Sequence, residues 1–545
     1  MRSEWPWEPG EWAAFWSAVQ RRPPAAMRLR RGFERPDLWP AGEPVPWHPD
    51  GRWCHERGEG DSESARKAAG KAVRLADSMV YAAGGYYIQD ASSLLAITLL
   101  DPRPGERICD LCAAPGGKST AILEALAGHG WLLANEPIRS RWGALQFNLA
   151  RHGAINYVLS QADPDTLADQ LASQFDAVLV DAPCSGQSLL GRKKQTESAF
   201  NDPTVAHCAA RQERILAAAQ RLVRPGGRLV YSTCTFAPAE NEQQVETLLR
   251  HSGDWTLEPD ERLSAWQSRL LPHTYRLWPH LHACSGTFAA RLIRRHLSSD
   301  SLTLVSREHE SSSGQRGYQA WAGEDRRAYE PVDEERQVAE RRQADRSGKP
   351  ASSARRASRR QDQRRMMHEE GSRFVHDAED EASLGKPSRK PSFSGRTGAS
   401  TPAREKPSAR FWQACSLPTA SEEWGQFTTP PMVWGNAVQQ FAWPCDLLES
   451  WLQVGLAGPE LAFRKGETWF PAYALAMRRD ETWQPREIFA LTDDEARKYL
   501  RGEPLHGRAQ GWCLATWQGL PLGWLKGDGK TLKNHLPKPG RCVVG

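Results

Sequence analysis

The sequence predicts a doubly wound α/β fold for residues 81–294, because short apolar runs alternate there with helix-like segments. The candidate strands are Arg107–Leu111, Gly130–Asn135, Asp176–Val180 and Arg228–Ser232. The candidate helices are Ser119–Ala127, Arg139–Arg151 and Ala206–Leu222. Each candidate strand is short, buried in character and followed by a turn and a helical pattern, as parallel βαβ units require. Ligands of such a fold bind beyond the carboxyl ends of its strands.

The composition is that of a soluble protein with several domains. A chain of 545 residues is too long for one hydrophobic core. Its 11 cysteines are spread singly, which does not suggest a secreted disulfide scaffold. The sequence shows no apolar run of the roughly 18 residues needed to cross a membrane, and no signal-peptide core at its start. We therefore expect a cytoplasmic protein without a membrane partner. The net charge of +5 is too small to identify a partner.

Shifts in composition divide the chain into four regions. Residues 1–80 form an N-terminal module and connector that contains the basic run Arg28–Arg31. Residues 81–294 carry the α/β pattern, and residues 410–545 resume Trp-rich and aliphatic sequence as a C-terminal region. Between them, residues 295–409 are rich in Ser, Arg, Glu and Gln and poor in large aliphatics, which predicts a disordered charged linker. The basic run Arg355–Arg365 in this linker could hold RNA loosely or be a solvated tether.

The segment Asp110–Lys118, read Asp-Leu-Cys-Ala-Ala-Pro-Gly-Gly-Lys, joins a strand to a helix and is a candidate cofactor loop. Its small residues allow close approach of a ligand, and the amides at the start of the helix can bind an anion. Glu136 ends the next strand, where a carboxylate can accept both hydroxyls of a ribose. Asp163 could accept from an adenine amine, although such a residue is more often a turn or cap. Cys109 and Cys112 have no second pair nearby, so we expect no metal.

Two cysteines end neighbouring strand motifs and are candidates for covalent catalysis. Cys184 lies in Asp-Ala-Pro-Cys-Ser-Gly and Cys234 in Ser-Thr-Cys-Thr. A single cysteine is more often a small buried hydrophobe, but two at strand ends beside a cofactor loop suggest chemistry. A thiolate that adds to carbon 6 of cytosine makes carbon 5 able to accept a methyl cation. Asp181 could hydrogen-bond the N3 and N4 edge of the base. The residues alone do not separate the roles of the two cysteines.

These motifs together resemble the Nop/Sun family of RNA cytosine-C5 methyltransferases, and within it the bacterial RsmF-type enzymes. The similarity spans about 280 residues. The matching segments are Tyr87–Ser93, Asp110–Lys118, Asn135 and Glu136 with Arg141, Asn148 and Arg151, Asp181–Gly186, Ser232–Thr235, Glu240–Glu242 and Gly286–Ala290. One segment departs from the family: Gln187–Arg192 follows the Pro-Cys motif where relatives often carry a Gly-basic run sooner. We expect this loop to contact RNA.

The resemblance implies a Rossmann-like methyltransferase domain that uses S-adenosylmethionine. It implies that Cys234 is the nucleophile and that Cys184 assists product release. It also implies a set of cofactor-binding residues. These are Cys112, Ala113, Ala114, Pro115, Gly116, Gly117, Lys118, Glu136, Arg141, Asp163 and Asp181.

The flanking regions resemble RNA-binding modules of the same family. The run Arg28–Arg31 and the segment after it resemble, in degenerate form, a small N-terminal module that contacts RNA. Three C-terminal segments, 511–515, 519–526 and 530–537, resemble the PUA-like domain of RsmF-type proteins. The basic residues of that domain suit contact with an RNA backbone, although a small β-barrel with ordinary surface lysines has the same pattern. These residues are Lys526, Lys530, Lys533 and Arg541. Tyr473 stands where the family usually has His.

The sequence therefore predicts an RNA (cytosine-5-)-methyltransferase that acts on small-subunit (16S) rRNA, working as a monomer. A tRNA cytosine-5 methyltransferase is the alternative within the same class, and the PUA-like module favours the ribosomal substrate. A non-catalytic RNA-binding factor for ribosome assembly is the alternative from another class. The retained Cys184, Cys234 and Glu136 argue against it.

Overall fold

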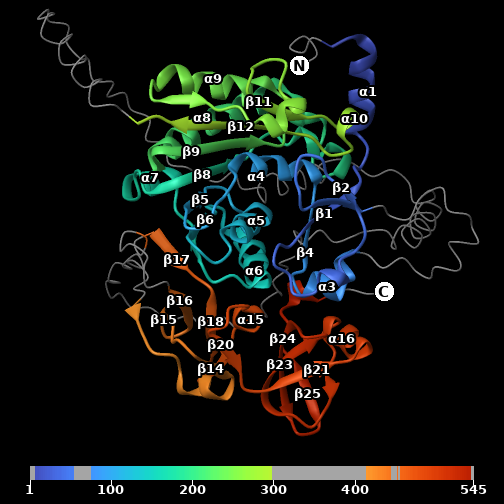
Figure 1. Ribbon diagram of the computed structural model, residues 1–545, viewed down its shortest axis with the longest axis vertical. Helices are drawn as coiled ribbons and strands as arrows, with labels where there is room; N and C mark the ends of the chain where they lie inside the picture. Colours follow the sequence, from blue (N-terminus) through green and yellow to red (C-terminus); the bar gives the residue numbers. More distant parts are fainter. Residues whose placement is uncertain (1–6, 55–74, 297–412, 444–450, 452–453, 542–545) are drawn as a thin grey trace, which may run out of the picture. The chain divides into compact units, whose positions relative to one another are not determined.

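The computed structural model describes residues 7–54, 75–296, 413–443, 451 and 454–541 (Figure 1). Its largest sheet has the order β10-β12-β9-β8-β5-β6-β7-β17, with β11 paired to β12. The run from β9 through β8, β5 and β6 to β7 is parallel, and β12 is antiparallel to β9. This order confirms the predicted doubly wound α/β fold. The strands are β5 (Arg107–Asp110), β6 (Trp131–Asn135), β7 (Tyr157–Ser160), β8 (Phe175–Asp181), β9 (Val223–Thr233), β10 (Trp255–Leu257), β11 (Thr274–Leu277), β12 (Thr287–Arg294) and β17 (Gly455–Ala457).

Helices cover both faces of this sheet because its central strands are apolar on both sides (Figure 1). Along β5, for example, Ile108 belongs to one hydrophobic core and its neighbour Cys109 to the other. The first core packs against α4 (Leu94–Leu100), α5 (Gly117–Leu126) and α6 (Trp142–His152). The second packs against α7 (Pro164–Gln170), α8 (Asp202–Leu222) and α9 (Glu242–His251).

The predicted elements lie where the sequence placed them, with differences at their ends. The helix expected over Arg139–Arg151 opens with a 3-10 helix, Arg139–Arg141, and becomes α-helical at Trp142. The helix expected from Ala206 begins earlier, at Asp202, with a proline in its first turn. The strand expected from Arg228 also begins earlier, at Val223.

The N-terminal residues form a second, antiparallel sheet of order β2-β3-β1-β4. Its fourth strand lies beyond residue 80, so this sheet draws on both sides of the boundary expected between the N-terminal module and the α/β region. A helix, α1, precedes the sheet, and two short helices, α3 and α10, complete this half of the chain. The bounds are α1 (Pro9–Val19), β1 (Ala25–Leu29), β2 (Glu43–Pro44), β3 (Gly51–Cys54), α3 (Met79–Ala82), β4 (Tyr86–Gln89) and α10 (Pro279–His282).

The structure corrects the expectation that the whole Arg28–Arg31 run contacts RNA. The Arg28 side chain is only 1% exposed and donates from Nε and Nη2 to both carboxylate oxygens of Glu124, at 3.0 and 2.9 Å. Arg30 is also buried and donates to the His152 carbonyl oxygen at 2.5 Å. Only Arg31 of the three is exposed, and it pairs with Asp50. Arg28 and Arg30 therefore hold the fold together instead of facing a phosphate backbone.

The described C-terminal residues form two five-stranded sheets and a two-stranded one. The first sheet has the order β13-β15-β16-β18-β19, the second β21-β23-β24-β25-β22, and β14 pairs β20. The predicted linker at 295–409 lies outside the described residues except for its first two. Within the described part of the chain, no helix is both long and apolar enough to cross a membrane. The bounds are β13 (Gln413–Ala414), β14 (Gly425–Phe427), β15 (Met432–Gly435), β16 (Gln439–Trp443), β18 (Glu460–Lys465), β19 (Thr468–Pro471), α15 (Tyr473–Met477), β20 (Trp483–Pro485), β21 (Ile488–Leu491), α16 (Asp493–Leu500), β22 (Leu505–His506), β23 (Gln510–Trp517), β24 (Leu520–Asp528) and β25 (Thr531–Asn534).

Candidate active site

The two candidate cysteines meet at the carboxyl edge of the central sheet. Strands β8 and β9 are parallel neighbours, and Asp181, the last residue of β8, lies opposite Ser232, the second-last residue of β9. Cys184 follows β8 and Cys234 follows β9 directly, so both side chains leave the sheet at the same edge. Their Sγ atoms are 3.0 Å apart and both residues are partly exposed. The structure thus brings together two thiols that are 50 positions apart in the sequence.

The surroundings of the two thiols differ. The hydrogen bond with Cys234 raises the pKa of the Cys184 thiol well above its ordinary value, and burial raises it further. Cys184 therefore keeps its proton at neutral pH. The other thiol, Cys234, interacts electrostatically with the ammonium group of Lys118.

Asp181, at the end of β8, is held between a cation and a hydroxyl. Lys118 Nζ lies 2.6 Å from Asp181 Oδ2, and Ser232 Oγ donates to Asp181 Oδ1 at 2.8 Å. Burial lowers the pKa of Lys118, but the carboxylate of Asp181 more than offsets this, so the pKa stands above its ordinary value. About a third of the Asp181 side chain is exposed, which leaves it open to a ligand. The sequence placed Lys118 only in the cofactor loop and missed its position beside Asp181 and Cys234.

The candidate cofactor loop depends on two glycines. Gly116 has a φ of +110°, a backbone conformation that side chains with a Cβ rarely adopt. A Cβ at Gly117 would lie 3.0 Å from both Gln89 Oε1 and a ring carbon of Tyr87. Helix α5 begins at Gly117, so its first amide groups border this loop. The loop therefore combines close-approach backbone with the positive end of a helix, as an anionic group requires.

Glu136 follows β6 and faces the same loop. The residue is 1% exposed, and its Oε2 accepts from the Ala114 amide at 3.3 Å. Its Oε1 accepts from the Ile138 amide at 3.0 Å. Arg141 lies over this carboxylate, with Nη1 3.2 Å from Glu136 Oε2 and Nη2 donating to the Ala114 carbonyl at 2.6 Å. Glu136, Arg141 and the loop thus form one connected group.

Asp110, the last residue of β5, is a further polar group that the sequence left without a role. It is 1% exposed, and its Oδ2 accepts from Ser119 Oγ at 2.7 Å. Its Oδ1 is buried and has no hydrogen-bond partner among the residues described. Burial is the largest of the causes that raise the pKa of Asp110 to about 7. An unpaired buried acceptor at the start of the cofactor loop suits a ligand that carries an ammonium group.

Asp163 lies at the start of α7 and is already engaged as a cap. Its Oδ1 accepts from the Asp165 amide at 3.0 Å, and its Oδ2 pairs with Arg214 at 3.1 Å. Almost half of the side chain is exposed. The structure therefore shows the helix-capping role that such residues commonly have, and the adenine contact stays a prediction.

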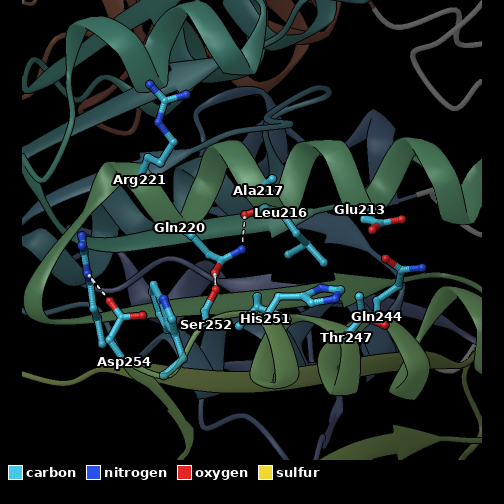
Figure 2. A pocket seen from close by; sticks show the side chains of 13 residues that line it. Glu213, Leu216, Ala217, Gln220, Arg221, Gln244, Thr247, His251, Ser252 and Asp254 are labelled. Carbon is cyan, nitrogen blue, oxygen red and sulfur yellow. Dashed lines mark hydrogen bonds and ion pairs between the residues drawn. The ribbon is translucent and has the colours of Figure 1, made fainter. Parts of the chain in front are cut away.

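A cavity of about 410 Å³ lies elsewhere, between α8 and α9 near the start of β10 and the end of β12 (Figure 2). None of the candidate site residues lines it. Two pairs of its polar side chains are bonded: Ser252 donates to Gln220 at 2.6 Å, and Arg294 pairs with Asp254 at 3.1 Å (Figure 2). This cavity is separate from the thiol pair.

Two family models match this chain. Residues 97–293 match the model described as 16S rRNA methyltransferase RsmB/F, and residues 486–541 match the methyltransferase RsmF PUA domain. The resemblance inferred from the motifs is confirmed in both regions.

Curated relatives of this chain are also named as methyltransferases of small-subunit rRNA. Ribosomal RNA small subunit methyltransferase F of Serratia proteamaculans is 34% identical over 259 residues, which is 47% of this chain and 52% of that protein. The protein of the same name from Salmonella arizonae is 35% identical over 254 residues, 46% of this chain and 51% of that protein. The chain thus matches about half the length of these relatives. A solved methyltransferase homologue from Pyrococcus horikoshii is 26% identical, with a TM-score of 0.43, and covers 52% of this chain and 90% of that one.

Proposed function

We propose that this chain methylates carbon 5 of a cytosine in small-subunit (16S) rRNA. Its residues 97–293 match the RsmB/F methyltransferases, and its residues 486–541 match the RsmF PUA domain. The observation that carries the proposal is the pair of thiols 3.0 Å apart beside Lys118 and Asp181. The relatives named as small-subunit rRNA methyltransferases support the choice of RNA. We place the enzyme in the cytoplasm, acting as a monomer.

The proposed cofactor is S-adenosylmethionine, which would supply the methyl group when bound. Its carboxylate suits the amides at the start of α5, and its ammonium group suits the unpaired Oδ1 of Asp110. The carboxylate of Glu136 is placed to accept from its ribose hydroxyls. Arg141, the loop Cys112–Lys118 and Asp163 complete the proposed set.

In the proposed reaction, the Cys234 thiolate adds to carbon 6 of the cytosine and forms a carbon–sulfur bond. The electron pair of the 5,6 double bond becomes available at carbon 5, which takes the methyl group. Asp181, held by Lys118 and Ser232, hydrogen-bonds the polar edge of the base as charge develops there. The proton on carbon 5 then passes to solvent at this partly exposed edge, its electron pair restores the double bond, and the carbon–sulfur bond breaks to return the thiolate. Cys184 assists this last step.

Two contacts support the assignment of different roles to the two cysteines. The ammonium group of Lys118 interacts electrostatically with Cys234 and pairs with Asp181 at 2.6 Å. Cys184 has a pKa well above its ordinary value because it is hydrogen-bonded to Cys234 and partly buried. The two thiols thus have different surroundings, which supports different roles for them.

The test compares Cys234→Ala with Cys184→Ala, using 16S rRNA purified from a strain that lacks the gene and labelled S-adenosylmethionine. Cys234→Ala should lose both methyl transfer and any covalent RNA adduct, because addition precedes transfer. Cys184→Ala should still add to the base and transfer the methyl group, but it should release the methylated RNA slowly. Denaturing gels should then show a slower, nuclease-sensitive band. The base must leave its stack, at a cost of a few kcal/mol, so adducts should form best in a loop or locally opened RNA.

Other outcomes select other functions. An adduct that appears with Cys234→Ala and vanishes with Cys184→Ala would reverse the two roles. Methylation unaffected by both substitutions would exclude thiol catalysis. Bisulfite sequencing of total RNA from the deletion strain identifies the substrate: loss of a modified cytosine from tRNA would favour a tRNA enzyme, and no loss at all would favour a non-catalytic assembly factor.

A further inference from the structure

A buried carboxylate lies directly behind the two thiols. Glu240 ends the 3-10 helix η8 (Pro238–Glu240), which follows the loop that carries Cys234. The residue is 0% exposed. In the part of the chain that the structure describes, no cation lies within ion-pair distance of Glu240, and its hydrogen-bond donors are neutral groups.

These donors come from both cysteine loops. Ser185, the residue after Cys184, donates to Glu240 from its amide at 2.9 Å and from Oγ at 2.6 Å. Thr235, the residue after Cys234, donates from Oγ1 at 3.3 Å. The Ser185 and Thr235 hydroxyls also lie 2.8 Å from each other. One carboxylate therefore ties together the two residues that adjoin the thiols.

A third donor links Glu240 to the helix behind the site. Gln212 of α8 donates from Nε2 to Glu240 at 2.9 Å and to the Pro183 carbonyl oxygen at 3.1 Å. Pro183 immediately precedes Cys184, so the backbone is held on both sides of this thiol. Hydrogen bonds from three separate segments therefore meet at one side chain and restrict the backbone around Cys184.

The nearby side chain of Glu242 differs from that of Glu240 in its hydrogen-bond partners. Its oxygens pair with the guanidinium group of Arg276 at 2.7 and 2.6 Å, and one of them also accepts from Ser268 at 2.6 Å. Neither Arg276 nor Ser268 adjoins a candidate cysteine. Both side chains are buried, but Glu242 pairs with a cation, whereas Glu240 is bonded to neutral donors that include the residues next to both thiols.

We propose that Glu240 is the positioning residue that keeps Cys184 at reacting distance from Cys234, and that it acts on the release step. The inference rests on the proposed function, because it assumes that Cys184 assists release. Without the carboxylate, the Ser185 and Thr235 loops lose their common acceptor. A displacement of about 1 Å at a reacting group can slow a reaction by about 100-fold. Loss of Glu240 should therefore resemble loss of Cys184 rather than loss of Cys234.

The experiment uses the full chain, the same 16S rRNA and labelled S-adenosylmethionine, and measures adduct and methyl transfer for each variant. Glu240→Ala should accumulate the covalent adduct as Cys184→Ala does, with turnover reduced by up to about 100-fold. Glu240→Gln should stay close to the unsubstituted protein, because its amide can donate to hydroxyls that also accept. Glu242→Gln is the matched control, and it should lower thermal stability while keeping the unsubstituted ratio of adduct to methyl transfer.

The outcomes separate the inference from the function on which it rests. If Cys184→Ala accumulates adduct and a folded Glu240→Ala does not, the positioning role is wrong. If Glu240→Ala loses adduct and methyl transfer together, Glu240 acts on addition and the inference is also wrong. If Cys184→Ala itself accumulates no adduct, the proposed release step fails and the inference falls with it. Should Glu240→Ala not fold, Ser185→Ala removes one hydroxyl donor and no charge, and absence of any adduct increase there overturns the inference.

Discussion

At the scale of single residues, the surroundings of the Asp110 carboxyl group oppose its ionisation. Its Oδ1 has no partner in the described structure, and the nearby carboxylates of Asp181 and Glu136 oppose its ionisation. Burial, the largest cause, raises its pKa from 3.8 to about 7, although Ser119 and Lys118 act in the opposite direction. The folded protein therefore binds a proton at Asp110 more tightly than the unfolded chain does.

This raised pKa predicts a pH-dependent stability. A group whose pKa is raised on folding stabilises the protein fully below its ordinary pKa, and this contribution disappears as the pH rises through the folded value. The contribution of Asp110 should thus be lost between about pH 4 and pH 7. Asp110→Asn should flatten the fall in thermal stability between pH 5.5 and pH 8, measured without cofactor. Parallel curves for the two proteins would show that Asp110 does not titrate in this range, and Asp165→Asn controls for loss of an exposed carboxylate.

At the scale of elements, the ion pair of Arg28 with Glu124 joins β1 of the N-terminal sheet to α5 of the central domain. Arg28 also donates to the Gly117 carbonyl at 2.7 Å and to Thr120 Oγ1 at 2.9 Å, in the first turn of the same helix. A basic residue from the N-terminal sheet thus anchors the helix that follows the cofactor loop.

Removing Arg28 should destabilise the fold rather than weaken RNA contact directly. Arg28→Ala leaves the buried Glu124 without its guanidinium partner, which typically costs about 3–5 kcal/mol. Arg31→Ala is the control, because its exposed pair with Asp50 is worth about 0–1 kcal/mol. Chemical unfolding monitored by circular dichroism measures both. Equal, small effects would mean that Arg28 is not a structural anchor.

Much of the central domain could be predicted because its signals are local. Apolar runs followed by turns marked the strands, and motifs at strand ends placed Cys184 and Cys234 at one edge. The burial of Arg28 could not be predicted, because its partner Glu124 is 96 positions away and a basic run reads the same whether exposed or buried. Glu240 was visible as part of a motif, but its contacts depend on how three separate segments meet.

At the scale of the whole molecule, the C-terminal domain presents lysines on neighbouring strands. Lys526 of β24 lies opposite Lys533 of β25, and the exposed Lys530 lies in the turn between these strands. The Lys526 ammonium group lies 5.2 Å from the centre of the Trp512 ring. Closely spaced charges of this kind suit a phosphate backbone.

Replacing Lys526, Lys530 and Lys533 together by Ala should weaken binding of 16S rRNA and reduce its salt dependence. If each lysine neutralises one phosphate, the slope of log K against log salt should fall in magnitude by roughly 2. Filter binding at several salt concentrations measures this slope, and cofactor affinity should not change. Lys498→Ala is the control, because that lysine already pairs with Asp494 in α16. An unchanged slope in the triple variant would remove these lysines from the RNA interface.

The pairing of β8 with β9 also determines when, during synthesis of the chain on the ribosome, the two thiols of the proposed reactive centre can come together. A growing chain that has passed Cys184 but has not reached Val223 contains Glu136 and the candidate cofactor loop. It still lacks β9, the strand that brings Cys234 next to Cys184. Contacts between distant positions form late, since the loop between them must close first. Glu240, which holds the two loops together, is made later still. The nascent protein therefore completes most of the proposed cofactor site before it has the pair of thiols that we propose to react with RNA.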